Sequence, residues 1–177
     1  AAKLDQVIFM PAALAPHKQS APRASDRDRV QMLKLAIGGH EAFAVSELEL
    51  ERGGVSYTID TLTTLREQHP DAELFLLMGA DTFLDLPNWR EPQRVIELSL
   101  PLIVGRGGLP SITDAALEWI PEPRRSQIRA AMVEMPLSEI SSSALRQAVR
   151  EGKSIRYLTP RPVEKYIEET GLYRERE

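Results

Sequence analysis

Five short runs that favour β-strands, each followed by a segment of helical character, constrain the fold of this chain more than any other feature. Four are dominated by aliphatic, β-branched and aromatic side chains, and the fifth alternates apolar and polar residues. The expected strands lie at residues 7–11, 43–50, 72–81, 100–108 and 132–137. Strands separated by helices imply right-handed crossovers and hence a parallel sheet. We therefore expect an α/β fold, a Rossmann-like doubly wound parallel sheet with helices on both faces.

Local signals indicate where several of these elements begin and end. Ser25 precedes a helical pattern and is a preferred N-cap residue, Pro92 suits a first helical turn, and Gly171 suits a helix stop. The run that ends at Gly79 is continuously apolar. That composition is typical of a strand buried on both faces of a parallel sheet.

Composition narrows the class of protein. With 177 residues and 42% hydrophobic side chains, the chain can bury one core, so we expect a single domain over residues 1–177 with a helical portion from about 141 to 177. The absence of cysteine excludes thiolate chemistry and suits a reducing compartment such as the cytoplasm.

Charge and hydropathy limit the partners. No run approaches the roughly 20 apolar residues that a helix needs to span a membrane. A net charge of −4 argues against nucleic acid as a partner, so we expect small anionic ligands and no membrane or nucleic acid.

Polar loops follow the predicted strands at the edge of the sheet where ligands collect in such folds. PAALAPHK presents His17 and Lys18, GAD presents Asp81, and GRGG and ISSS follow later strands. Glycine, serine and cationic side chains favour a nucleotide over a sugar or lipid. Asp81 would contact a ribose, assist a metal or cap the next helix, and Trp89 would stack on a planar ring or cover the core.

The stretch ISSSALRQ, residues 140–147, lies at the expected start of an amphipathic helix, whose Leu145 and Val149 are predicted to face inward. Ser141 suits the N-cap, and the free N–H groups at a helix start favour an anion. Arg146 lies one turn after Ser142 and would close over a phosphate bound there. Plain capping needs only one hydroxyl, so three serines and an arginine exceed what capping requires.

Taken together, these segments resemble the bacterial nicotinate mononucleotide adenylyltransferases of the nucleotidyltransferase superfamily. The resemblance covers nearly the whole chain, and ISSSALR is similar to the family signature ISSTxIR, with Ser143 at the usual Thr and Leu145 at the usual Ile. The segments that carry it are PAALAPHK and the helix after it, ELERGGVSYTIDTL, LLMGADTFLDLPNW, the GR after IVG, ISSSALR and YLTPRPVEKYIEETGLY.

The resemblance implies transfer of AMP from ATP to nicotinate mononucleotide, which gives deamido-NAD and pyrophosphate in NAD biosynthesis, usually with Mg²⁺. It places three groups of side chains by role. His17, Lys18 and Arg146 would act at the reacting phosphates, and Tyr57, Thr58 and Trp89 would bind nicotinate mononucleotide. ATP would be bound by Gly79, Ala80, Asp81, Arg106, Ile140, Ser141, Ser142, Ser143 and Arg146. We name no residue as a metal ligand, because the ligands of the metal cannot be read from the sequence, and formation of a homo-oligomer stays open.

One departure from the family pattern is large. Family members begin with a strand that ends in GGxFDPxHxGH, whose histidines bind the ATP phosphates, and these 177 residues do not contain it. His40, in IGGHEAF, lies at a helix end and is not expected to replace it. We expect the sequence to be a fragment of a normal enzyme whose first strand is missing here, with little turnover by the 177 residues alone.

Two other functions remain open from the sequence. One is another adenylyl- or cytidylyltransferase of the same superfamily, although VSYTIDTL and LPNW resemble the pyridine-nucleotide enzymes. The other is a nucleotide-binding module without catalysis, which would use the ISSSALR and PHK loops for regulation. Titration with ATP and nicotinate mononucleotide, followed by an assay for pyrophosphate, distinguishes binding from turnover.

Overall fold

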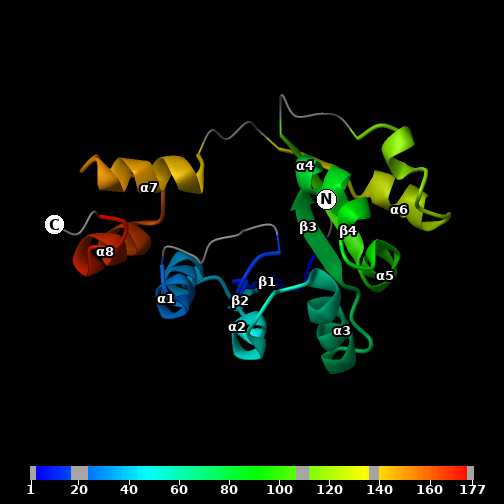
Figure 1. Cartoon of the computed structure of the whole chain (residues 1–177), viewed down its shortest axis with the longest axis horizontal. Helices are drawn as coiled ribbons and strands as arrows, with labels where there is room; N and C mark the ends of the chain where they lie inside the picture. Colours follow the sequence, from blue (N-terminus) through cyan, green and yellow to red (C-terminus); the bar gives the residue numbers. More distant parts are fainter. Residues whose placement is uncertain (1–2, 17–23, 107–111, 136–139, 175–177) are drawn as a thin grey trace. The chain divides into compact units, whose positions relative to one another are not determined.

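The computed structural model describes residues 3–16, 24–106, 112–135 and 140–174 (Figure 1). The strands lie within or close to the predicted runs, and helices separate most of them. The elements in chain order are β1 (Val7–Phe9), α1 (Asp26–Ile37), β2 (Phe43–Val45), α2 (Leu48–Arg52), α3 (Thr58–Gln68), β3 (Phe75–Gly79), α4 (Ala80–Asp85), the 3-10 helix η1 (Leu86–Asn88), α5 (Pro92–Leu98), β4 (Leu100–Arg106), the 3-10 helix η2 (Ala115–Leu117), α6 (Arg124–Ala130), β5 (Val133–Met135), α7 (Ser142–Arg150) and α8 (Arg161–Thr170).

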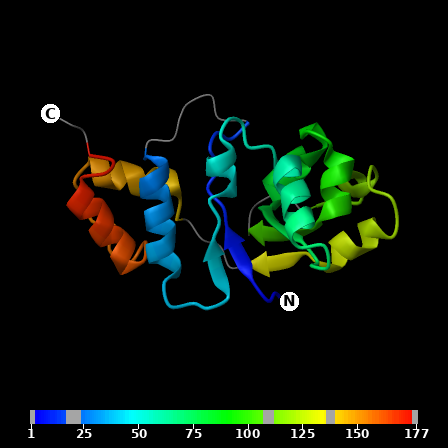
Figure 2. The same cartoon turned by 90° about the horizontal axis from the view of Figure 1, so that it is seen from below.

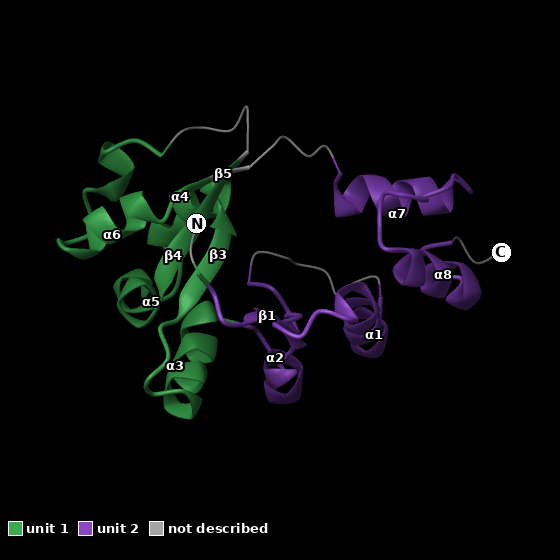
Figure 3. Ribbon diagram, turned by 180° about the vertical axis from the view of Figure 1, so that it is seen from behind, with its two compact units in different colours: residues 1–3, 57–138 green, residues 4–56, 139–177 purple. Residues whose placement is uncertain are grey.

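The chain divides into two compact units (Figure 3). Unit 1 contains residues 1–3 and 57–138, and unit 2 contains residues 4–56 and 139–177. Each unit has its own parallel sheet: β3, β4 and β5 in unit 1, and β1 with β2 in unit 2. The predicted parallel α/β fold is confirmed, although its strands form two sheets. The prediction of a single domain stays a prediction.

Unit 1 is built around β4, the central strand of its sheet. β4 pairs with β3 and β5, and α4, α5 and α6 all contact it. The core contains Phe83, Leu86, Val95, Ile103 and Ile128, each at most 1% exposed. The end of β3 and all of α4 therefore rest on a tightly packed base.

Unit 2 has a smaller core, formed by α1, α7 and α8, which lie side by side in Figure 2. Ile155, Val163 and Ile167 are its buried residues, and Leu145 and Val149 of α7 pack against them. These two side chains were predicted to face inward. The predicted ends are also confirmed, because Ser25 caps α1, Pro92 opens α5 and Gly171 ends α8 in a left-handed conformation.

Two predictions about strands were wrong in part. Residues 43–50 do not form one strand, because β2 ends at Val45 and the Leu- and Glu-rich residues that follow form α2. Such residues have a high helix propensity. The strand ending at Gly79 is not buried on both faces, since Leu77 is 61% exposed. β3 is an edge strand of its sheet, so fewer neighbours cover it than cover β4.

A hydrogen bond between side chains joins α8 to α1 in unit 2. The Tyr166 hydroxyl donates to Asp28 Oδ1 at 2.8 Å, and the Ser25 hydroxyl donates to Asp28 Oδ2 at 2.6 Å. The bond from Ser25, which has the larger effect, and the bond from Tyr166 both lower the pKa of Asp28 below its ordinary value of 3.8. Because the folded-state pKa is lowered, the carboxylate stabilises the fold above pH 3.8, and that contribution is lost as the pH falls through the folded-state value.

We expect Tyr166→Phe to reduce the free energy of unfolding at pH 7, because the hydrogen bond to Asp28 is lost. The reduction should shrink as the pH falls through the folded-state pKa of Asp28, where the carboxylate takes up a proton and the charge-assisted bond weakens. Urea unfolding at pH 7 and at a series of lower pH values measures the difference. Tyr157→Phe serves as a control, because Tyr157 is 87% exposed. Equal losses for the two variants would show that the Asp28 bond contributes nothing.

Candidate active site

The helix after the three serines begins where the sequence predicts. Ser141 is the N-cap of α7, with extended backbone angles, and its hydroxyl accepts a hydrogen bond of 3.1 Å from the Ala144 N–H. Ser142 and Ser143 follow as exposed residues of the first turn, which contains no acidic side chain. Capping thus uses one of the three hydroxyls. The other two stand at the positive end of the helix dipole, where an anion is stabilised.

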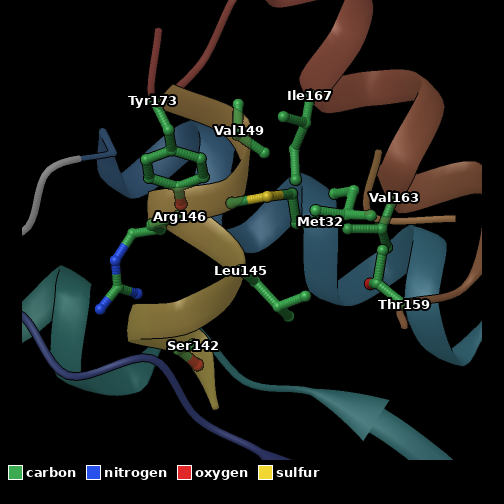
Figure 4. Close-up of a pocket in the computed structure, with 10 residues that line it drawn as sticks. Met32, Ser142, Leu145, Arg146, Val149, Thr159, Val163, Ile167 and Tyr173 are labelled. Atoms are coloured by element: carbon green, nitrogen blue, oxygen red, sulfur yellow. The ribbon is translucent and has the colours of Figure 1, made fainter. Parts of the chain in front are cut away.

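Arg146 lies one turn further along α7. Its Nη2 donates to Ser143 Oγ at 3.4 Å, and within the described part of the chain no ion pair connects it to a carboxylate. Arg146 and Tyr173 line the same cavity. Burial raises the pKa of Tyr173, and the positive charge of Arg146 opposes that rise. In Figure 4 the guanidinium extends away from the apolar side chains beside it. It can therefore contact a ligand at the start of α7.

A cavity of about 200 Å³ lies beside α7, between α1 and α8 of the same unit (Figure 4). Most of its lining is apolar, including Met32, Leu145, Val163 and Ile167. A polyphosphate needs N–H donors and cations, which these side chains do not provide. Ser142 and Arg146 also line the cavity, so its polar part lies at the first turn of α7, and an anion would bind there.

The β3–α4 junction in unit 1 contains the GAD residues. Gly79 ends β3 and is the N-cap of α4, Ala80 is buried, and Asp81 is exposed in the first helical turn. A Cβ atom at Gly79 would lie only 2.5 Å from Asp81 Oδ1. The absence of a side chain at Gly79 therefore lets the Asp81 carboxylate approach the end of the strand.

Two separate sequence motifs meet on the same unit. Tyr57 precedes α3 and Thr58 is its first residue, while Trp89 follows η1. The guanidinium of Arg90, the neighbour of Trp89, stacks over the Tyr57 ring at 4.9 Å from its centroid and lies 3.6 Å from Asp60 Oδ2. The start of α3 and the LPNW motif, far apart in sequence, are thus adjacent in space.

The Trp89 ring is held in two ways. Its body packs against the core of unit 1, and its indole Nε1–H donates to Asp85 Oδ2 at 3.3 Å. The other carboxylate oxygen of Asp85 accepts a hydrogen bond of 3.0 Å from Asn88 Nδ2. An aromatic ring fixed at one edge and packed along its body is suited to stacking on a planar ligand.

The loop after β1 is anchored from both sides within unit 2. Arg29 Nη1 donates to the Ala12 carbonyl at 2.7 Å, and the Ala13 N–H donates at 3.0 Å to the hydroxyl of Ser56, which is 6% exposed. This part of the loop leads toward His17 and Lys18, which lie outside the described residues. Arg106 is the last residue of β4, which runs parallel to β3. Its side chain is not among those that the structure describes.

The comparisons with known proteins agree on one family. Residues 1–148 match the model of the cytidylyltransferase-like family. A "Probable nicotinate-nucleotide adenylyltransferase" from Thermomicrobium roseum is 41% identical over 172 residues, which cover 97% of this chain and 79% of the relative. One of the same name from Synechococcus sp. is 42% identical over 173 residues, with 96% and 83% covered. This chain belongs to the nicotinate-nucleotide adenylyltransferase family.

A solved structure of a member of this family has the same fold. Nicotinic acid mononucleotide adenylyltransferase of Plasmodium falciparum complexed with NaAD superimposes with a TM-score of 0.71 and 19% sequence identity. The match covers 96% of this chain and 82% of that one. At this identity the likeness concerns the fold alone, which confirms the nucleotidyltransferase type of α/β fold.

The adenylyltransferase residues predicted from the sequence fall into two groups by unit. Tyr57, Thr58, Trp89 and the GAD residues belong to unit 1, whereas the half-exposed Ile140 and the first turn of α7 belong to unit 2. Their individual roles stay predictions. None of the helices described in the structure has the length and apolar character that crossing a bilayer requires.

Sequence reasoning missed three residues that lie beside predicted site residues or anchor a predicted site loop. Asp85 and Arg90 flank the LPNW motif and hold its surroundings, and Ser56 anchors the loop after β1. The spacing of four between Asp85 and Trp89 is compatible with contact across one helical turn. Nothing in the sequence indicates that Arg90 contacts Tyr57 or that Ser56 contacts Ala13, because these pairs are distant along the chain.

Proposed function

We propose that this protein transfers AMP from ATP to nicotinate mononucleotide, giving deamido-NAD and pyrophosphate, and thereby makes the dinucleotide in NAD biosynthesis. The observation that carries the proposal is the 41% identity over 97% of the chain with a nicotinate-nucleotide adenylyltransferase. The geometry of the described residues supports it, because each motif of the family presents chemistry suited to one part of the two substrates.

In the proposed reaction, a 5′-phosphate oxygen of nicotinate mononucleotide attacks the α-phosphorus of ATP. A new P–O bond forms, the bond from the α-phosphorus to the bridging oxygen breaks, and pyrophosphate leaves with the electron pair. No protein nucleophile takes part. The protein aligns two anionic substrates and stabilises the charge that gathers on the phosphates. The histidines of GGxFDPxHxGH are absent from these 177 residues, so no step is assigned to them here.

The first turn of α7 would bind the ATP phosphates. Ser142 and Ser143 offer hydroxyls beside the free N–H groups of the helix start, and Arg146 adds a charged fork that suits phosphate oxygens. Asp81, with Gly79 and Ala80, would contact the riboses at the end of β3. His17 and Lys18 would complete the phosphate site, and Arg106 would lie near the adenine. These three roles are proposed from the resemblance alone.

The acceptor would bind at Tyr57, Thr58 and the LPNW motif, all in unit 1. Trp89 would stack on the pyridine ring, and main-chain N–H groups near Thr58 would receive its carboxylate. An amide in place of the carboxylate would direct its own N–H donors at these main-chain N–H groups. This mismatch favours nicotinate over nicotinamide mononucleotide. The structure adds support through Arg90, which connects the two motifs by its contact with Tyr57.

Mg²⁺ is assigned to the phosphates of ATP. Among the described residues, no three acidic, histidine or cysteine side chains form a metal-binding group. Mg²⁺ that arrives with ATP needs only one or two carboxylates from the protein, and Asp81 offers one at the strand end. The ion would neutralise charge on the departing pyrophosphate. Cytoplasmic location stays a prediction from composition.

We expect the full-length protein to release pyrophosphate from ATP in the presence of nicotinate mononucleotide and to form deamido-NAD, identified by its mass. Nicotinamide mononucleotide should react more slowly at equal concentration. A coupled phosphate assay measures both rates. Pyrophosphate release with a different acceptor only would assign the protein to another reaction of the superfamily, and calorimetric binding of ATP without turnover would identify a binding module.

A further inference from the structure

We propose that Asp85 is a positioning residue for the acceptor, which fixes the plane of the Trp89 indole so that the pyridine ring of nicotinate mononucleotide stacks on it. The proposal rests on the proposed function, because it concerns the acceptor of that reaction. Asp85 itself touches no substrate in this proposal. Its effect passes through the hydrogen bond to Trp89.

The contacts of Asp85 explain how it can fix the ring. Oδ2 accepts the indole N–H of Trp89 at 3.3 Å, while Oδ1 accepts the Asn88 side-chain N–H at 3.0 Å. With both oxygens engaged, the carboxylate cannot rotate without losing one of these bonds. The indole is therefore held at its polar edge by a group that is itself oriented.

The base beneath Asp85 is rigid. Asp85 ends α4, and its neighbours Phe83 and Leu86 are 1% and 0% exposed in the core of unit 1. The Trp89 N–H of the backbone donates to the Leu86 carbonyl at 3.0 Å, so the chain between the two side chains is closed into a turn. Position and orientation of the ring are thus both defined before a ligand arrives, which lowers the entropy cost of stacking.

α4 also connects the two substrate sites. Asp81 in its first turn is proposed to contact a ribose, and Asp85 lies four residues later on the same helix. At 1.5 Å per residue, these positions are separated by about 6 Å along the axis. A short helix with a buried side would keep this spacing constant, so the ribose contact and the stacking ring are placed by the same rigid element.

Kinetics of the full-length protein give the first test. We expect Asp85→Ala to raise the KM for nicotinate mononucleotide about fivefold while the KM for ATP and kcat change less than twofold. Asp85→Asn keeps an oxygen that accepts the indole N–H and should stay within about twofold of the parent protein. Asp114→Ala is the matched control, since it removes an exposed carboxylate that pairs with Arg129 in the same unit. Equal KM changes for both substrates, or none, would overturn the proposal.

Fluorescence gives a second test that does not depend on turnover. The chain contains two tryptophans, so Trp119→Phe leaves Trp89 as the only reporter. In that background Asp85→Ala should lower the emission anisotropy of Trp89 without ligand and raise the concentration of nicotinate mononucleotide that half-quenches it. Unchanged anisotropy and quenching would refute the positioning role. If the mononucleotide does not quench Trp89 even with Asp85 present, the proposed acceptor site is wrong instead.

A double-mutant cycle closes the remaining alternative, that Asp85 acts through general stability. Trp89→Phe keeps an aromatic ring but has no N–H to donate, so it should raise the KM for the mononucleotide by a similar factor. Asp85→Ala should then add nothing in the Trp89→Phe protein, because the bond is already absent. A further rise of severalfold would show that Asp85 acts by another route and would contradict the proposal.

Discussion

Replacing Arg146 by alanine in the full-length protein should lower kcat/KM for ATP by about 30- to 140-fold. The physical basis is the loss of hydrogen bonds between a guanidinium and phosphate oxygens, about 2 to 3 kcal/mol. In the structure the guanidinium contacts Ser143 only through a long bond of 3.4 Å, so little must be broken before it binds an anion. Steady-state kinetics with ATP varied at a fixed concentration of nicotinate mononucleotide measure the effect.

The control for Arg146 lies on the same helix. Arg150 ends α7 and bonds Gln147, at the opposite end from the three serines. Arg150→Ala should change kcat/KM for ATP less than twofold. Arg146→Lys should give an intermediate loss, because it keeps the charge and loses the fork. A protein with Arg146→Ala that retains its ATP kinetics would remove the phosphate role of this helix end.

The first turn of α7 shows what local sequence can determine. Ser141 was predicted as the N-cap, and Leu145 and Val149 were predicted to face inward, and all three are confirmed. Capping depends on one side chain and the N–H groups two or three residues later, and the apolar face depends on the helical repeat. Both are properties of a short segment, so the sequence contains enough information to predict them.

Leu77 and Arg90 show what local sequence leaves open. The apolar run around Leu77 predicted burial on both faces, but exposure depends on which strands pair with β3. Likewise, the contact of Arg90 with Tyr57 depends on how α3 packs near the turn after α4. The sequence is enough to place a motif such as GAD or ISSS at the end of a strand or the start of a helix. Which motifs lie next to each other depends on the tertiary structure, which a single short segment does not determine.

We expect Trp89→Ala to raise the KM for nicotinate mononucleotide by about thirtyfold while the KM for ATP stays within twofold. Stacking of an aromatic side chain on a base contributes on the order of 1 to 3 kcal/mol, and alanine removes it entirely. The ring also packs against the core of unit 1, so part of the cost will appear as lower stability. Kinetics with each substrate varied in turn, together with a thermal unfolding curve, separate the two contributions.

Trp119→Phe is the matched variant for Trp89→Ala, because Trp119 also packs against this core and donates its indole N–H to the Ala116 carbonyl at 3.1 Å. It should lower the unfolding temperature without a selective effect on either substrate. Similar increases in both KM values after Trp89→Ala would mean that the side chain supports the fold and not the pyridine ring. A selective increase for the mononucleotide alone would assign the ring to the acceptor, since a general loss of packing has no reason to spare ATP.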